Sequence, residues 1–230
     1  MASLYFYIYS SVRSLRLVRD RLDFTASLCE LIVRILCDDA PEEVDAVYSF
    51  SQTTCNEGSQ VQKLLEMSLK YKRATILYSG EDGSRQCGWA GYQRFEEKLK
   101  LAGISSSRMS MVPFPETEVS INTLKECTAL VKFCLSQNIR KILVVAPPFH
   151  QVRCTLTLLS CVAKINERSF QVYSAPSLVD DWLKNVHHSQ GTLYGTRESL
   201  INAELNRIRK YHIKGDLISP DAAMAMLSTR

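Results

Sequence analysis

The segment Phe149-His150-Gln-Val-Arg153 follows an apolar run over residues 141–146 and carries the clearest chemistry in the chain. On a helix, His150 and Arg153 would occupy neighbouring positions of one turn. The His150 imidazole could exchange a proton near neutral pH, and the Arg153 guanidinium could hold a phosphate or a carboxylate. Because a cation at a helix N-terminus opposes the helix dipole, Arg153 needs a carboxylate partner or an anionic ligand. We therefore expect Arg153 to bind a ligand. For His150, acid–base catalysis and a hydrogen-bonded structural role are the alternatives.

A second polar group, Ser120-Ile-Asn-Thr123, precedes an amphipathic segment that begins near Leu124. Ser, Asn and Thr commonly cap helix N-termini. The same backbone N–H groups and hydroxyls can also bind an anion. Since a cap uses one side chain and leaves the others available, Ser120, Asn122 and Thr123 are candidate ligand-binding residues.

Two more apolar runs end in small polar residues. Ser49 ends the first run, and Ser79-Gly80-Glu81 follows the second. A glycine there would let the backbone approach a ligand closely. The sequence contains neither G-x-x-x-x-G-K-[ST] nor G-x-G-x-x-G, so an ordinary turn is the alternative. We include Ser49, Ser79, Gly80 and Glu81 among the ligand-binding candidates.

Glu204 interrupts the apolar stripe of the last long predicted helix, between Ile201 and Ile208. A carboxylate that faces a core needs a cationic partner. Arg153 and Arg207 are the candidates. We expect Glu204 and Arg207 to support the site through an ion pair that ties this helix to the sheet.

Apolar patterning predicts the scaffold that positions these residues. Short apolar runs predict strands, and longer segments with helical spacing predict the helices between them. We expect strands at residues 44–50, 74–78, 109–112, 141–146 and 169–174, and helices at 58–71, 91–102, from 124 onward and at 151–165. This alternation predicts parallel strands joined by right-handed crossovers. In such sheets, ligands bind outside the carboxyl ends of the strands, where the strand order reverses.

The predicted fold class is therefore α/β. We expect a Rossmann-like three-layer α/β/α sandwich with a mostly parallel sheet and additional helices at both ends of the chain. Residues 1–40 would form an N-terminal helical extension, residues 41–176 the core, and residues 177–230 C-terminal helices packed on the core. The whole would be a single domain.

Composition excludes several classes of protein. The chain has 230 residues, a net charge of +4, 46% hydrophobic residues and eight cysteines. Such a mild charge excess does not favour a nucleic-acid partner. No two cysteines form C-x-x-C, so no metal site is predicted. Two pairs, Cys127 with Cys134 and Cys154 with Cys161, have two-turn helical spacing, which favours burial as small apolar side chains in a reducing compartment.

No segment is apolar and long enough to span a bilayer, so we expect a soluble, cytoplasmic protein. One feature allows an alternative. Four arginines decorate a predicted N-terminal helix that could lie on a membrane surface, although a packed helix with a solvated basic face is the more common case. These residues are Arg13, Arg16, Arg19 and Arg21.

Several motifs together resemble a known family. In chain order they are Ser79-Gly80, Leu99-x-x-x-Gly-Ile104, Ser120-x-Asn-Thr123, Ile142-Leu-Val-Val-x-x-x-Phe-His-x-x-Arg153 and Glu204-x-x-Arg-x-x-x-Tyr211 with Gly215. Their order and spacing resemble the domain-of-unknown-function family typified by the bacterial proteins YdcF, SanA and ElyC, and the soluble YdcF type in particular. The resemblance covers residues 43–165. It implies a Rossmann-like fold and S-adenosylmethionine as a ligand, and it implies no general reaction.

Three positions depart from that family's pattern. Ser49-Phe-Ser-Gln52 stands where the family has a glycine-rich segment, Gly91 where it has an acid, and Glu126 where it has an asparagine. Lost glycines would narrow the approach to a phosphate or a ribose. The lost acid would remove a candidate metal ligand or base.

Three hypotheses follow. The leading one is a protein that binds a nucleotide-like or anionic small molecule, with S-adenosylmethionine as the guess that the resemblance supplies. The second is a hydrolase or transferase for a phosphorylated or glycosyl substrate, with His150 as the acid or base. The third is a degenerate, non-catalytic scaffold, which a pocket filled by Phe50, Trp89 or Tyr92 would favour.

Overall fold

The structure is a computed structural model that describes residues 23–84, 88–118, 120–167, 169–179, 181–188 and 192–230. Its centre is a five-stranded parallel sheet with the strand order β3-β2-β1-β4-β5. The strands are β1 (Ala46–Ser49), β2 (Thr75–Ser79), β3 (Met109–Val112), β4 (Lys141–Val145) and β5 (Gln171–Ser174). Each strand lies within one or two residues of its predicted position or inside it.

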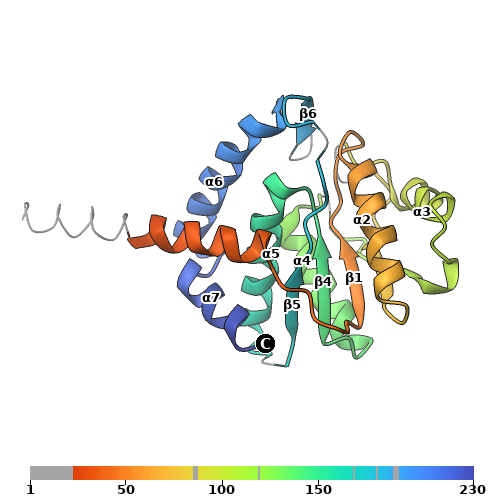
Figure 1. Ribbon diagram of the computed structural model, residues 1–230, viewed down its shortest axis with the longest axis horizontal. Helices are drawn as coiled ribbons and strands as arrows, with labels where there is room; N and C mark the ends of the chain where they lie inside the picture. The colour runs from red at the N-terminus through yellow and green to blue at the C-terminus, as the bar shows by residue number, and fades with distance from the viewer. Residues whose placement is uncertain (1–22, 85–87, 119, 168, 180, 189–191) are drawn as a thin grey trace, which may run out of the picture.

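Helices cover both faces of the sheet (Figure 1). One face packs against α2 (Glu57–Lys70) and α3 (Tyr92–Leu101). The other packs against α4 (Thr123–Ser136), α5 (Pro148–Lys164), α7 (Pro220–Ser228) and a helix over residues 23–36, with α6 (Arg197–Ile213) beside α5. The predicted three-layer α/β/α sandwich is confirmed.

Strand β4 shows why the apolar runs become the middle of the sheet. Its residues Ile142, Leu143, Val144 and Val145 are all fully buried. Ile142 and Val144 contribute to the cluster under α4 and α5, whereas Leu143 and Val145 contribute to the cluster under α2 and α3. A strand buried on both faces has no polar alternation, which is the pattern that its sequence shows.

The C-terminal part of the chain differs from the prediction of helices alone. An antiparallel hairpin of β6 (Asn185–His188) and β7 (Leu193–Thr196) precedes α6. The hydroxyl of Thr53 donates a hydrogen bond to the His187 carbonyl (2.6 Å), so a distant loop holds this hairpin. Helix α5 also begins at Pro148, earlier than the predicted residue 151, because proline is favoured in the first turn of a helix.

The terminal parts of the chain share the core. Leu28, Leu31 and Ile35 of the helix over residues 23–36 lie in the same hydrophobic cluster as α4 and α5. The four arginines of the predicted N-terminal helix lie outside the described residues. Cys127, Cys134, Cys154 and Cys161 are buried free thiols, which confirms the expected burial. Within the described ranges, no helix combines the length and the apolar character needed to cross a membrane.

Candidate functional site

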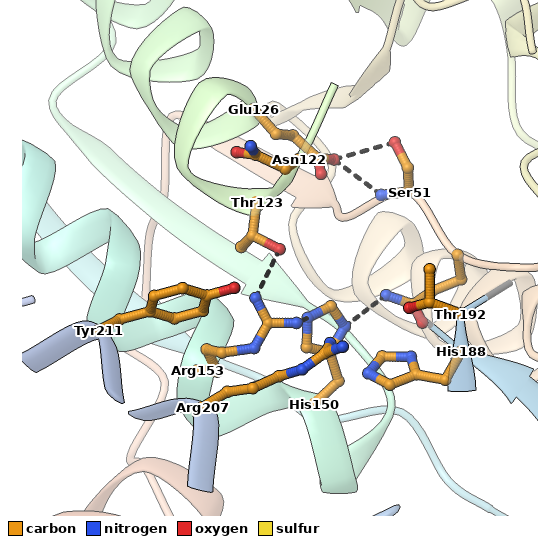
Figure 2. Close-up of a pocket in the computed structure, with 11 residues that line it drawn as sticks. Ser51, Asn122, Thr123, Glu126, His150, Arg153, His188, Thr192, Arg207 and Tyr211 are labelled. Carbon is orange, nitrogen blue, oxygen red and sulfur yellow. Dashed lines mark hydrogen bonds between the residues drawn. The ribbon is translucent and has the colours of Figure 1, made fainter. Parts of the chain in front are cut away.

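A polar cavity of about 140 Å³ opens at the carboxyl ends of β1 and β4 (Figure 2). The chain adds β2 and β3 on one side of β1 and then returns to place β4 on the other side, so the strand order reverses here. This is the position that the fold class predicts for a ligand. The cavity is lined by Ser51, Gln52, Asn122, Thr123, Glu126, His150, Arg153, His188, Thr192, Arg207 and Tyr211.

Arg153 joins three elements at the cavity wall. Its Nε and Nη2 donate to the carboxylate of Glu204 on α6, and its Nη1 donates to Thr123 Oγ1 at the start of α4 (2.9 Å). Arg153 and Glu204 are only 7% and 2% exposed. The predicted ion pair between α5 and α6 is confirmed, and it answers the need of Arg153 for a carboxylate partner.

The carboxylate of Glu204 also contacts two further side chains. His188 Nε2 lies 2.9 Å from its Oε1, and Arg207 Nη1 lies 3.5 Å from the same oxygen. Burial opposes the charge of Glu204, but the charge of Arg153 and the hydrogen bond from His188 outweigh it and hold its pKa far below the ordinary value. Two arginines that line the cavity therefore share the ionised carboxylate of Glu204, which leaves one unit of positive charge as long as the Glu126 carboxyl group is protonated.

His150 is engaged at both ring nitrogens. Gln52 Nε2 lies 2.7 Å from Nδ1, and Arg153 Nη2 lies 2.8 Å from Nε2 (Figure 2). Burial and the charge of Arg153 hold its pKa well below the ordinary value, so the ring is neutral. An arginine can only donate, so His150 Nε2 must accept; the neutral ring then carries its proton on Nδ1, and the Gln52 amide must present its oxygen to that proton. This geometry matches the structural alternative for His150, because each ring nitrogen already has a protein side chain as its partner.

Glu126 is the other buried carboxyl group of the site, and it lines the cavity directly. It is not among the site residues that we predict from the sequence. Its Oε1 accepts hydrogen bonds from Tyr48 Oη (2.7 Å), Ser51 N (2.8 Å) and Ser51 Oγ (3.0 Å). Burial raises its pKa to about 7, although these donors and Arg153 lower it. The signal available was its place beside Cys127 on the apolar face of a predicted helix. That signal appeared only as a departure from a family pattern.

The structure places five of the sequence candidates outside this cavity. Ser49 and Ser79 are the last residues of β1 and β2, Gly80 and Glu81 lie in the loop after β2, and Ser120 lies in the loop before α4. Asn122, Thr123, His150 and Arg153 do line the cavity, together with Arg207.

Packing explains why the loop after β2 stays away from the cavity. Strand β2 lies on the side of β1 opposite to β4, so its end is one strand further from the reversal point. Glu81 is fully buried, its carboxylate accepts from Gly83 N (2.8 Å), and its carbonyl accepts from Trp89 Nε1 (3.0 Å). A side chain at Gly80 would lie 2.7 Å from the Val112 carbonyl oxygen. The glycine serves β2–β3 packing here.

Ser49 and Ser120 have local partners too. The Ser49 hydroxyl accepts from Gln60 Nε2 (3.0 Å) on α2. The Ser120 carbonyl accepts from Lys125 Nζ (2.9 Å), and its side chain lies at the surface. The ends of β1 and β4 and the start of α4 therefore share the cavity, whereas the loop after β2 does not line it.

The backbone conformation of Gly91 explains why this position holds a glycine and not an acidic residue. Its φ is +91°, a region that residues with a side chain rarely adopt, and an added Cβ would lie 2.3 Å from the Asp82 carbonyl oxygen. Phe50, Trp89 and Tyr92 do not fill the cavity. Phe50 packs on Tyr48, Trp89 packs on Phe95, and Tyr92 packs against the cluster beneath α3.

His150, His188 and Glu204 have the residue types of a metal site, and their ligand atoms lie within 4.8 Å of one another. The guanidinium of Arg153 contacts both His150 and Glu204, so a cation already occupies the centre of this group. A metal ion would also lie beside Arg207. The arrangement therefore does not fit a divalent ion.

No protein-family model matches this sequence, and no curated protein is significantly similar to it. The resemblance to the YdcF type thus rests on the motifs alone. The function has to be inferred from the cavity.

Proposed function

We propose that this chain binds a small anionic molecule in the strand-end cavity. The observation that carries the proposal is that two arginines line the cavity, Arg153 and Arg207, and both share the ionised carboxylate of Glu204. Arg153 is buried and holds Glu204 closely, whereas the side chain of Arg207 is 23% exposed and lies 3.5 Å from it. Arg207 is therefore the cation best placed to meet an anion.

Neutral donors surround the same space. Asn122 caps α4 with its Oδ1, which accepts from Lys125 N (3.1 Å), so its amide NH₂ remains a donor. Thr123 Oγ1 accepts from Arg153 (2.9 Å) and keeps its own proton to donate. With Tyr211, these groups can satisfy the oxygens of a phosphate or a carboxylate.

The size of the cavity limits the ligand. A volume of about 140 Å³ is below the 300–1,000 Å³ that is typical of pockets for drug-sized molecules. A second cavity of about 230 Å³ shares Asn122, Thr123, Arg153 and Tyr211 with it. A nucleotide-like ligand would therefore place its anionic group in the first cavity and its remainder in the second.

S-adenosylmethionine is the specific ligand that the family resemblance suggests. Its carboxylate suits Arg207, but its sulfonium cation gains nothing beside two arginines. A phosphate compound without that cation is the better match to the charge of this site.

Substitution of Arg207 tests the proposal. Isothermal titration with inorganic phosphate, adenosine monophosphate and S-adenosylmethionine would measure the dissociation constants for wild type and Arg207→Gln. Because a hydrogen bond to a charged group contributes about 1.5–3 kcal/mol, we expect anion binding to weaken by about 10- to 100-fold. Arg209→Gln is the matched control, since Arg209 is exposed on the same helix. If both variants bind as tightly as wild type, the cavity is not the anion site.

A hydrolase or transferase acting on a phosphorylated or glycosyl substrate is the second candidate, and Glu126 favours it. A carboxyl group with a pKa of about 7 in a cavity wall suits a general acid or base at neutral pH. We expect any turnover of p-nitrophenyl phosphate or p-nitrophenyl glycosides to fall at least 100-fold in Glu126→Gln. The pH profile of wild-type turnover should show an apparent pKa near 7. Unchanged rates in that variant would exclude Glu126 from this role.

A further inference from the structure

Glu126 has no part in the charge network around Glu204, yet it borders the same small cavity. Its side chain is 2% exposed. All three of its hydrogen bonds, from the Tyr48 hydroxyl and from the backbone and hydroxyl of Ser51, end on Oε1. These donors fix the orientation of the carboxyl group and satisfy one of its two oxygens. A ligand in the cavity would meet a rigidly held carboxyl group.

The surroundings of Glu126 supply little positive charge. Arg153 on α5 is the charged group that acts on it, and Arg153 is already paired with Glu204. The other titratable neighbours are Tyr48 on β1, Cys127 on α4 and Cys154 on α5, and burial raises the pKa of each, so all three stay neutral. Glu126 forms no ion pair within the part of the chain that the structure describes.

This arrangement opposes an ordinary anion. Arg207 and Glu126 both line this cavity of about 140 Å³, so a ligand that spans it meets the guanidinium on one side and the carboxyl group on the other (Figure 2). Two anionic groups in contact repel each other unless a proton lies between them. Hydrogen phosphate carries such a proton and can donate it to Glu126. Sulfate has the same shape and charge but has no proton to donate.

We propose that Glu126 is a specificity-determining residue that selects a proton-bearing phosphate group over sulfate. The proposal rests on the proposed function, because it concerns which anion the same cavity accepts. Arg207 supplies the attraction and Glu126 supplies the discrimination. A site built to accept a ligand proton rejects an analogue that lacks it, since the buried acceptor is then left unpaired beside a negative charge.

The preference for phosphate over sulfate should depend on pH. Burial raises the pKa of Glu126 to about 7, so below that pH the residue carries its own proton and can donate to either anion. Above it, sulfate binding requires Glu126 to take a proton from water, whereas hydrogen phosphate brings one. The preference for phosphate should therefore grow as the pH rises through 7.

Titration calorimetry with inorganic phosphate and inorganic sulfate tests this selection. At about pH 8.5 we expect wild type to bind phosphate at least tenfold more tightly than sulfate, and this preference should shrink at about pH 6, where Glu126 carries its own proton. Glu126→Gln offers an amide donor to both anions. We expect it to bind sulfate at about pH 8.5 more tightly than wild type does, which a misfolded protein would not do. Glu97→Gln, at an exposed position of α3, is the control.

The outcomes separate the two proposals. If wild type binds both anions equally at high pH, or if Glu126→Gln gains no sulfate binding, Glu126 does not determine specificity. If neither anion binds wild type and Arg207→Gln changes nothing, the proposed function itself fails and this inference fails with it.

Discussion

Two buried carboxyl groups with opposite protonation behaviour belong to the site: Glu126 lines the cavity, and Glu204 pairs with arginines that line it. Arg153 and the hydrogen bond from His188 hold the pKa of Glu204 far below the ordinary value despite its burial. Glu126 meets hydroxyl and amide donors, and burial raises its pKa to about 7. Environments that push two carboxyl pKa values apart are typical of sites where one group holds charge and the other exchanges a proton.

The pKa of Glu126 predicts a pH dependence of stability. Between its ordinary value of 4.5 and about 7, the native chain keeps a proton that the unfolded chain has released. Stability therefore falls as the pH rises through this window, by about 3 kcal/mol in total. We expect the unfolding free energy of Glu126→Gln, relative to wild type, to rise between pH 5 and pH 8. Urea denaturation at these two pH values would measure it.

Comparing Glu126→Gln with wild type cancels the contributions of the other titratable groups to the pH dependence of stability. His150 and His188 have lowered pKa values and change stability in the opposite direction, but they do so in both proteins. Glu97→Gln should show the pH profile of wild type. A constant difference between Glu126→Gln and wild type across this pH range would mean that Glu126 has an ordinary pKa in the folded chain.

Residues in locally unfavourable positions were the predictable part of the site. Arg153 at a helix start and Glu204 in an apolar stripe each required a partner, and each is the partner of the other. Glu126 gave a weaker signal of the same kind, its place beside Cys127 on the apolar face of a predicted helix. Its burial depends on Tyr48 and Ser51, which lie more than 70 positions earlier in the chain, and local sequence patterns do not report that contact.

Among the elements, buried strands and amphipathic helices were predictable and strand order was not. The apolar run that became β4 is uniform enough to identify a central strand. Nothing in the sequence states that β2 lies on the far side of β1, and this placement removes Ser79, Gly80 and Glu81 from the cavity. The local sequence pattern determines whether a segment forms a helix or a strand. The order of the strands determines which strand ends lie side by side, and the local pattern does not encode that order.

The hairpin of β6 and β7 was missed for a related reason. Its strands are four residues long, and much of what holds it is distant in the chain. Arg197, which follows β7, donates to Asn56 Oδ1 (3.1 Å), the Cys55 carbonyl (3.0 Å) and the Asp181 carbonyl (2.7 Å). A short strand held by such contacts has little sequence signal of its own. The hairpin nevertheless brings His188 to Glu204, so it belongs to the site.

At the scale of the molecule, segments from both ends of the chain meet at the edge of the sheet. Asp38 follows the helix over residues 23–36, and its carboxylate accepts from Ser174 N of β5 (2.9 Å). Arg230 pairs with the same carboxylate, donates to the Val172 carbonyl, and lies 4.3 Å from the centre of the Tyr173 ring. The Asp38 side chain is 1% exposed, so this link is buried.

This buried link predicts that the terminal helices and the core unfold together. Removing one partner of a buried ion pair leaves an uncompensated charge and costs about 3–5 kcal/mol, so Asp38→Asn should lose that much stability in urea denaturation. Asp216→Asn is the control, because its pair with Lys214 lies at the surface and contributes at most about 1 kcal/mol. Circular dichroism and tryptophan fluorescence should report one coincident transition in wild type. If the two signals separate, or if Asp38→Asn loses no more stability than Asp216→Asn, the sheet edge does not join the ends of the chain to the core.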